Sequence, residues 1–190
     1  MRNLFEVLST AHREMEQMLG EFESLLGPGE QPTAELNRKG ASLADTVITA
    51  ASQHEAAEEQ YFWPVVKDRL PNGDSLAAGG VEQESEAKKV LNKLDGMAAN
   101  DGQFIPLLTS FVRDTREHIA YEEEQVWPGL RNVLSDEESD ELGEKLAKAQ
   151  ENGPTRPHPH TPPNPALLKA AGPAVAAADR LRDSVTRRDN

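Results

Sequence analysis

The chain has 190 residues and a formal net charge of −13, from 33 acidic and 20 basic side chains. This acidity opposes binding to nucleic acid and to anionic membranes by electrostatics. The sequence has no cysteine, which excludes disulfides, thiolate zinc and cysteine-held iron–sulfur clusters. Any metal must therefore be held by nitrogen and oxygen. No apolar run is long enough for a signal-peptide core or a membrane span, so we expect a cytoplasmic protein.

Apolar residues at helical spacing predict a first helix over residues 4–26, which Gly27-Pro28-Gly29 would end. His12 falls on the apolar stripe of this helix, between Leu8 and Met15. An imidazole on a buried stripe is either a hydrogen-bonded core histidine or a metal ligand.

A second helix is expected after Thr33, and its apolar line runs from Leu36 to Val65. His54 and Glu58 occupy that line. Pro64 is expected to bend or end the helix, because proline lacks the backbone N–H that a helix interior needs.

A third helix follows the turn at residues 71–74, with Glu84 on its inner face, and a fourth carries His118 and Glu122 on its apolar stripe. Glu84 also lies within a run of charged residues, and such a run is more often an exposed face. Four amphipathic helices with short connections predict an all-α, up-down-up-down four-helix bundle over residues 1–132.

The remaining chain is predicted to form two appendages. Ser135 and Glu138 have the spacing of a capping box, which predicts an additional helix within residues 133–152. Residues 153–190 are expected to form an extended proline-rich linker and a short C-terminal helix, the latter from about Pro173 to Arg188.

One motif occurs twice. The segment from His54 to Pro64 and the segment from His118 to Pro128 agree at six of eleven positions, and each contains one of the two tryptophans of the chain. In each copy a histidine precedes a glutamate by four residues, so both side chains face the same side of a helix. That is a metal-ligand spacing.

The apolar stripes thus carry imidazoles and carboxylates, which are costly to bury unless they are paired or coordinated. The inward polar residues are His12, His54, Glu58, Glu84, His118 and Glu122. A shared cation would satisfy all of them, and the donor set suits iron or manganese, with zinc not excluded by ligand type. We expect Glu58 and Glu122 to bridge two metals. His12 and His54 would bind one of them, and His118 with Glu84 the other.

On these residues the chain resembles the hemerythrin-like, or HHE cation-binding, family over about residues 3–132. The resemblance implies a four-helix bundle that encloses a non-haem di-iron centre. The family usually has histidine on the third helix, within Glu-His-x-x-x-Lys-x-x-Leu, where this chain has Glu84. A more anionic ligand set favours ferric iron, so redox turnover or oxygen activation is expected rather than reversible oxygen carriage.

The functional expectation is a di-iron protein that binds and processes dioxygen or peroxide, with peroxide disproportionation as its most concrete enzymatic form. Three alternatives stay open. The protein could sense or store oxygen, nitric oxide or iron without turnover, it could be a ferroxidase, or it could be a metal-free bundle used for association.

Several neighbours of the predicted ligands have weaker assignments. Tyr61 is expected either to donate a hydrogen bond to a small oxygen ligand or simply to pack. Glu59 and Glu123 are expected at the surface, with a hydrogen bond to a ligating histidine as the alternative. The Trp-Pro pairs that begin at Trp63 and Trp127 are expected to close the bundle end and shield the metals.

Overall fold

The computed structural model describes residues 2–25, 34–162 and 164–186, and every regular element within these ranges is helical. In chain order the elements are α1 (Leu4–Leu25), α2 (Ala34–Ala57), the π-helical η1 (Glu58–Phe62), α3 (Trp63–Arg69), α4 (Gly73–Leu94), α5 (Phe104–Ala120), the π-helical η2 (Tyr121–Val126), α6 (Trp127–Val133), α7 (Asp136–Glu151) and α8 (Pro165–Thr186). The predicted all-α class is confirmed. None of the helices in the described ranges is long and apolar enough to cross a membrane.

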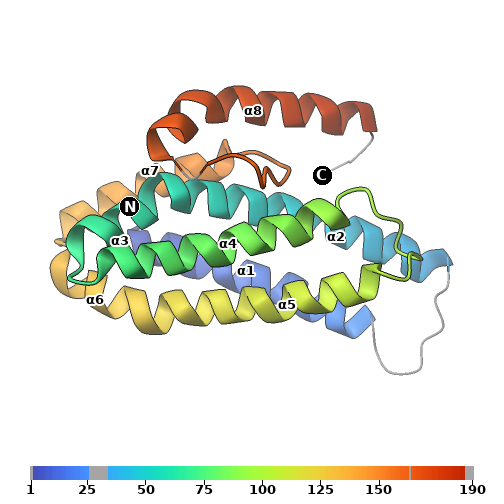
Figure 1. Ribbon diagram of the computed structural model, residues 1–190, viewed down its shortest axis with the longest axis horizontal. Coiled ribbons are helices and arrows are strands. Elements are labelled where there is room, and N and C mark those ends of the chain that lie inside the picture. Colours follow the sequence, from blue (N-terminus) through green and yellow to red (C-terminus); the bar gives the residue numbers. More distant parts are fainter. Residues whose placement is uncertain (1, 26–33, 163, 187–190) are drawn as a thin grey trace.

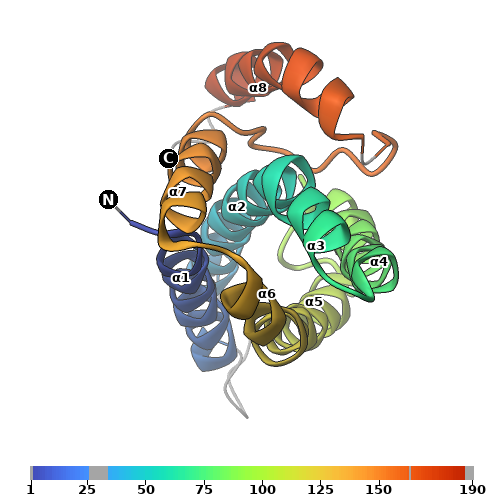
Figure 2. The same ribbon diagram turned by 90° about the vertical axis from the view of Figure 1, so that its left-hand side faces the viewer.

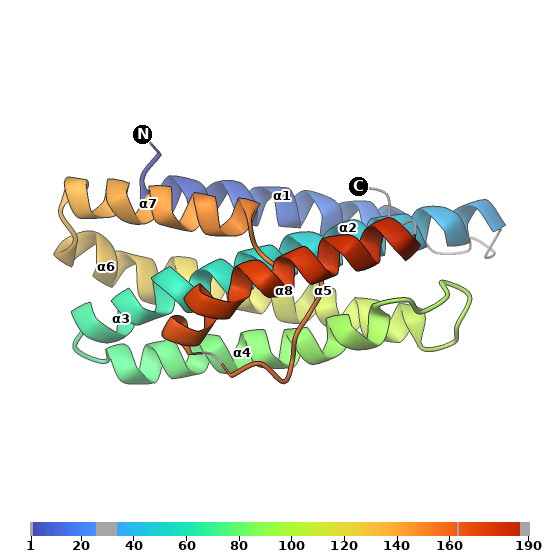
Figure 3. The ribbon, with the colours of Figure 1, turned by 90° about the horizontal axis from the view of Figure 1, so that it is seen from above.

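Four rods form the bundle: α1, the continuous α2–η1–α3, α4, and the continuous α5–η2–α6 (Figure 1). Seen along the bundle, the rods surround a common interior, with α7 outside the pair α1 and α2 (Figure 2). The last helix, α8, crosses the outside of the bundle over α2 and packs against η1 (Figure 3). The Gly27-Pro28-Gly29 segment, which was expected to end the first helix, lies outside the described residues. The same holds for the side chain of Leu36.

The apolar core is divided into two clusters along the bundle. One cluster contains Leu8 of α1 and Val126 of η2, and the other contains Met15 of α1 and Val112 of α5. His12 lies between Leu8 and Met15 in the sequence, so the helix passes through a polar layer between the two clusters. A layer of buried polar groups in an apolar bundle needs partners within that layer.

Both copies of the repeated motif pass through a π-helical segment directly after the turn that begins at the motif's histidine. Pro64 was expected to bend or end the helix, and the second of these alternatives is wrong: the chain stays helical and continues as α3 to Arg69. Pro64 and Pro128 each fall in the first turn after their π segment, where a missing backbone N–H is tolerated. The extra residue per turn changes which side chains face the interior, at the positions of Glu58 and Glu122.

The C-terminal region differs from the extended linker and short helix that the sequence predicts. Helix α8 begins at Pro165 and contains Pro173. The described part of the proline-rich segment packs on the bundle, because Arg156 is 6% exposed and pairs with Asp95 at 2.7 Å and Asp183 at 2.7 Å. A buried ionic network thus helps to hold the segment on the bundle. The capping box at Ser135 is present as predicted.

Candidate metal centre

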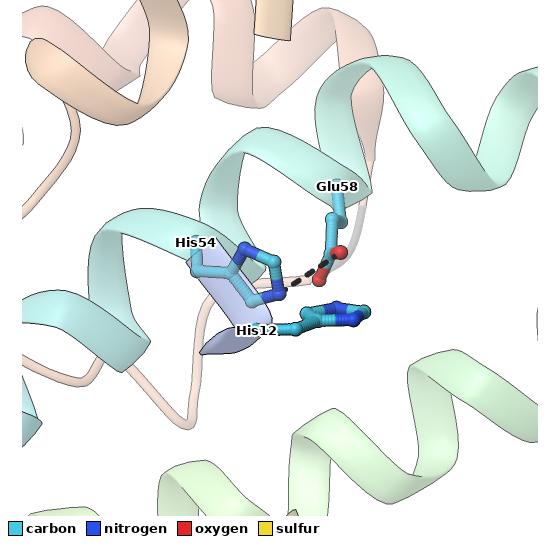
Figure 4. A group of neighbouring side chains, drawn as sticks. All are labelled: His12, His54 and Glu58. Atoms are coloured by element: carbon cyan, nitrogen blue, oxygen red, sulfur yellow. Dashed lines mark ion pairs between the residues drawn. The ribbon is translucent and has the colours of Figure 1, made fainter. Parts of the chain in front are cut away.

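The structure brings all six predicted residues together in the polar layer. The first group is His12, His54 and Glu58, and the second is Glu58, Glu84, His118 and Glu122; within each group one potential ligand atom per residue lies within 4.8 Å of the others. Glu58 belongs to both groups. Figure 4 shows the first group, in which His54 and Glu58 of the α2–η1 rod point toward the imidazole of His12 from α1.

Each histidine in the layer turns its Nε2 atom toward a carboxylate. Nε2 of His54 lies 3.1 Å from Oε1 of Glu58, four residues on. Nε2 of His118 lies 3.2 Å from Oε1 of Glu122, again four residues on. The other oxygen of Glu122 lies 3.3 Å from Nε2 of His12, so this carboxylate stands between helices α1 and α5. The repeated spacing in the sequence therefore becomes a pair of facing imidazole–carboxylate units.

Most of these inward atoms are buried without a hydrogen bond to another described residue. They are Nε2 of His12 and His118, both carboxylate oxygens of Glu58 and of Glu122, and Oε2 of Glu84. Leaving one such group unsatisfied costs roughly 1–3 kcal/mol, and more if it is charged. Because the atoms are nitrogens and carboxylate oxygens that face one another, the residues fit a bound cation pair of the kind that bundle cores hold.

The opposite nitrogen of each imidazole is held by a different helix. Nδ1 of His12 lies 2.8 Å from Oε1 of Glu123, and Nδ1 of His118 lies 2.9 Å from Oε1 of Gln83. Nδ1 of His54 lies 2.9 Å from the side-chain amide of Gln150 in α7. Such contacts fix the orientation of the ring, so that Nε2 is presented inward. The amide of Gln150 can serve either tautomer, because turning it exchanges its N–H donors for its carbonyl acceptor.

A hydrogen bond between Glu123 and a histidine is one of the two alternatives that the sequence leaves open, and the structure shows that contact with His12. The contacts of Gln83 and Gln150 are not predicted from the sequence. Neither glutamine has a characteristic spacing from the histidine that it supports, since each lies on another helix.

Glu84 is 1% exposed, which excludes the exposed-face alternative. Its Oε1 accepts a hydrogen bond from Nε1 of Trp63. The indole reaches this position because residue 80 is glycine: a Cβ there would lie 2.1 Å from the Trp63 ring. Trp127 stacks on His12 at 5.3 Å between ring centroids. Both tryptophans of the repeat belong to the apolar cluster that contains Leu8, so they cover the polar layer from the same end of the bundle.

A buried lysine adjoins the layer. Lys88, one turn after Glu84 in α4, donates a hydrogen bond to Oε1 of Glu59 at 2.5 Å, and its Nζ lies 4.0 Å from Oε2 of Glu84 and 4.0 Å from Oε2 of Glu55. The expectation that Glu59 lies at the surface is wrong, since it is 6% exposed. Glu59 lies at the start of the π-helical η1, and its ion pair with Lys88 joins this segment to α4.

Tyr61 has no described contact with the six residues. Its ring instead faces Nζ of Lys169 in α8, 4.4 Å from the ring centroid. This is the packing alternative of the sequence analysis, with a cation as the partner.

Burial and neighbouring charges set the protonation of the layer. Burial, together with the nearby His12, lowers the pKa of His54 to about 3, so this imidazole is neutral at pH 7. Burial raises the pKa of Glu58 and of Glu84 well above the usual range. Burial acts in the same direction on Glu122, but contacts with His118 and His12 outweigh it and hold the pKa of this carboxyl below its ordinary value. Glu122 is therefore the carboxylate that stays ionised beside the histidines.

Comparison with known proteins agrees with this geometry. Residues 3–130 match the model of the hemerythrin HHE cation-binding domain. An uncharacterized hemerythrin-like protein of Schizosaccharomyces pombe is 30% identical over 155 residues, which cover 77% of this chain and 76% of that protein. No solved structure matches the chain. From the family model, the relative and the arrangement of helices, we conclude that the chain belongs to the hemerythrin HHE cation-binding domain family.

Proposed function

We propose that the polar layer holds two iron ions and that the protein binds and processes dioxygen or peroxide, with peroxide disproportionation as its most concrete activity. The ligands would be His12, His54, Glu58, Glu84, His118 and Glu122, with Glu58 and Glu122 between the two ions. The same donors also suit manganese. When bound, such a metal pair supplies electron exchange with a small oxygen ligand, and the chain supplies the pocket, the orientation of the ligands and the exclusion of water.

The observation that carries this proposal is the size of the cavity within the polar layer. Its volume is about 30 Å³, and its walls include four of the predicted ligands, His12, His54, Glu84 and His118, together with Met15, Ala51, Phe111 and Ile119. A cavity of this size admits a water molecule or a molecule of two heavy atoms, but no organic substrate. Dioxygen, peroxide and nitric oxide are molecules of that size.

The chain's own groups control what reaches this cavity. Thr115 also lines it and offers a hydroxyl group, and Glu55, Gln83 and Asp114 add further polar groups to the wall. The stacked Trp127 and the buried Trp63 exclude bulk water from one end of the layer. Exclusion of water strengthens every electrostatic interaction inside the site, because there is little water to screen it.

A direct test is to mix iron-loaded protein with hydrogen peroxide and to follow oxygen release with an electrode and the visible spectrum. We expect peroxide consumption that disappears in Glu58→Gln, together with loss of bound iron. The matched control is Glu86→Gln, because Glu86 is exposed on the same bundle and contacts Lys89. Wild-type protein that binds iron, consumes no peroxide and shows no spectral change on adding it would refute the catalytic part of the proposal.

A sensing function without turnover is the second candidate, and one contact supports it. Gln150 lies near the end of α7, directly before the C-terminal tail, and its amide contacts His54. A change at His54 on metal or ligand binding would therefore act on the helix that leads into the tail. This candidate predicts that metal loading changes protease cleavage in the tail while peroxide is not consumed.

A further inference from the structure

A second, larger cavity lies between the bundle and the C-terminal tail, residues 154–186. We call it the tail cavity; its volume is about 300 Å³. Ser52, Ala56 and Lys88 line it from the bundle, and Pro157, Leu168 and Ala171 line it from the tail. Because the family model ends at residue 130, one wall of this cavity is built by a segment that the family domain does not contain.

The tail cavity is mainly apolar, with a polar floor on the bundle side. Ala56 and the apolar tail residues form its walls, to which the tail also contributes Arg156, His158, His160 and Thr161. The floor includes Ser52, Lys88 and Glu59. Ser52 is 2% exposed, and its hydroxyl oxygen has no hydrogen bond to another described residue. A buried hydroxyl without a partner is unusual in a folded protein, and a ligand that supplies the partner accounts for it.

Lys88 supplies a second donor at the same floor. Its ammonium group has three N–H bonds, and one of them points to Glu59 at 2.5 Å. The carboxylates of Glu55 and Glu84 lie at 4.0 Å, which is beyond hydrogen-bonding distance. The floor therefore offers N–H and O–H donors to an oxygen atom that enters the cavity.

The charge around the floor selects a neutral oxygen rather than an anionic one. The carboxylate of Glu59 already pairs with the ammonium group of Lys88 at 2.5 Å. Arg156 also lines the cavity, and Asp95 and Asp183 pair with its guanidinium group. The chain as a whole carries a net charge of −13. An anion would therefore add a negative charge beside cations that already have carboxylate partners, and burial of an uncompensated charge is costly.

The volume limits the size of the ligand. A cavity of 300 Å³ lies at the lower end of the range for small-molecule sites, and it equals the liquid volume of roughly ten water molecules. A molecule of one or two rings fits this space.

We propose that the tail cavity binds an uncharged, mainly apolar organic molecule of one or two rings that carries a hydroxyl or carbonyl oxygen, with this oxygen accepting hydrogen bonds from Ser52 and Lys88. Since Lys88 is also 4.0 Å from Glu84, the bound molecule lies one side chain away from the polar layer. The binding itself does not depend on the metal, so it can be measured in metal-free protein.

The test uses 2-naphthol as the probe, titrated into the full-length protein and followed by calorimetry and by naphthol fluorescence. Ala171→Trp places a large ring in the cavity, and Ala170→Trp is the matched control, because Ala170 is exposed on the same helix and does not line the cavity. Ser52→Ala removes one donor of the floor. Helix content and the unfolding midpoint are measured for every variant, so that a folding defect is recognised.

We expect one molecule of 2-naphthol to bind per chain, with binding kept in Ala170→Trp and lost in Ala171→Trp. Ser52→Ala should weaken binding about fivefold, the effect of one neutral hydrogen bond. Naphthalene lacks the hydroxyl group. Its affinity for the wild type should be no higher than the affinity of 2-naphthol for Ser52→Ala. No binding of 2-naphthol, or equal binding by both tryptophan variants, would overturn the proposal. If Ala171→Trp fails to fold, equal affinities of 2-naphthol for the wild type and Ser52→Ala would overturn it.

Discussion

The close approach of Trp63 to helix α4 gives a sharp prediction for Gly80→Ala. A Cβ at residue 80 would lie 2.1 Å from Cη2 of Trp63, whereas carbon atoms in contact are about 3.5–4.0 Å apart. The indole is 3% exposed and donates a hydrogen bond to Glu84, so it cannot turn outward without losing both burial and that bond. Overpacking of this kind costs about 1–3 kcal/mol. Alanine in a helix interior regains about 0.5–1 kcal/mol relative to glycine. We therefore expect a net loss of about 1–2 kcal/mol in the free energy of unfolding.

The assay is urea unfolding of metal-free protein, followed by tryptophan fluorescence and by circular dichroism. Gly20→Ala in α1 is the control, since a Cβ at residue 20 has no neighbouring atom within 4 Å. That variant should gain about 0.5–1 kcal/mol, because only the helix propensity changes. If Gly80→Ala proved as stable as Gly20→Ala, the described packing of Trp63 against α4, and with it the positioning of Glu84, would be wrong.

Four further predictions concern the tail, the metal and the capping box. Arg156→Met should lower the free energy of unfolding by about 3 kcal/mol and expose residues 154–162 to protease, because it removes buried contacts with Asp95 and Asp183. Unchanged protease cleavage would contradict this. Chelating the metal should lower the melting temperature by roughly 8–16 °C in calorimetry, if the free ion is at about 1,000 times its dissociation constant; equal melting of loaded and chelated protein would speak against binding. Ser135→Ala should lower the free energy of unfolding, measured in urea, by about 1 kcal/mol. Arg69 and Ser135 lower the pKa of Glu138 in the folded protein. The ionised carboxylate therefore stabilises the fold above its ordinary pKa of 4.5, and this stabilisation is lost as the pH falls through the lower pKa of the folded state. A pH titration of the unfolding midpoint in Glu138→Gln should lack that loss.

The bundle and the predicted ligands could be found from the sequence because their signals are local. The four-residue spacing of His54 and Glu58 places both side chains on one face, and the second copy at His118 and Glu122 shows that the spacing is not accidental. His12 and Glu84 lack a local partner in the motif, and only their position on apolar stripes pointed to the interior. The family resemblance on these residues agrees with the matched family model.

The features that the sequence did not reveal depend on contacts between distant segments. Glu59, in the π-helical turn at Glu58–Phe62, is buried against Lys88, which lies on another helix. The support of His54 by Gln150 requires α7 to lie against α2, which no local pattern specifies. The proline-rich segment has the composition of a linker, but the buried ion pairs of Arg156 hold it on the bundle.

The central claim is that imidazoles and carboxylates from four helices converge on a pair of metal ions. The most direct measurement is elemental analysis of the full-length protein purified from iron-supplemented medium, together with its near-ultraviolet and visible spectrum. We expect about two iron ions per chain in the wild type, an absorption band characteristic of a close iron pair, and loss of both in Glu58→Gln. Protein that elutes without metal under these conditions, and that takes up none from added ferrous or manganous salts, would contradict the account.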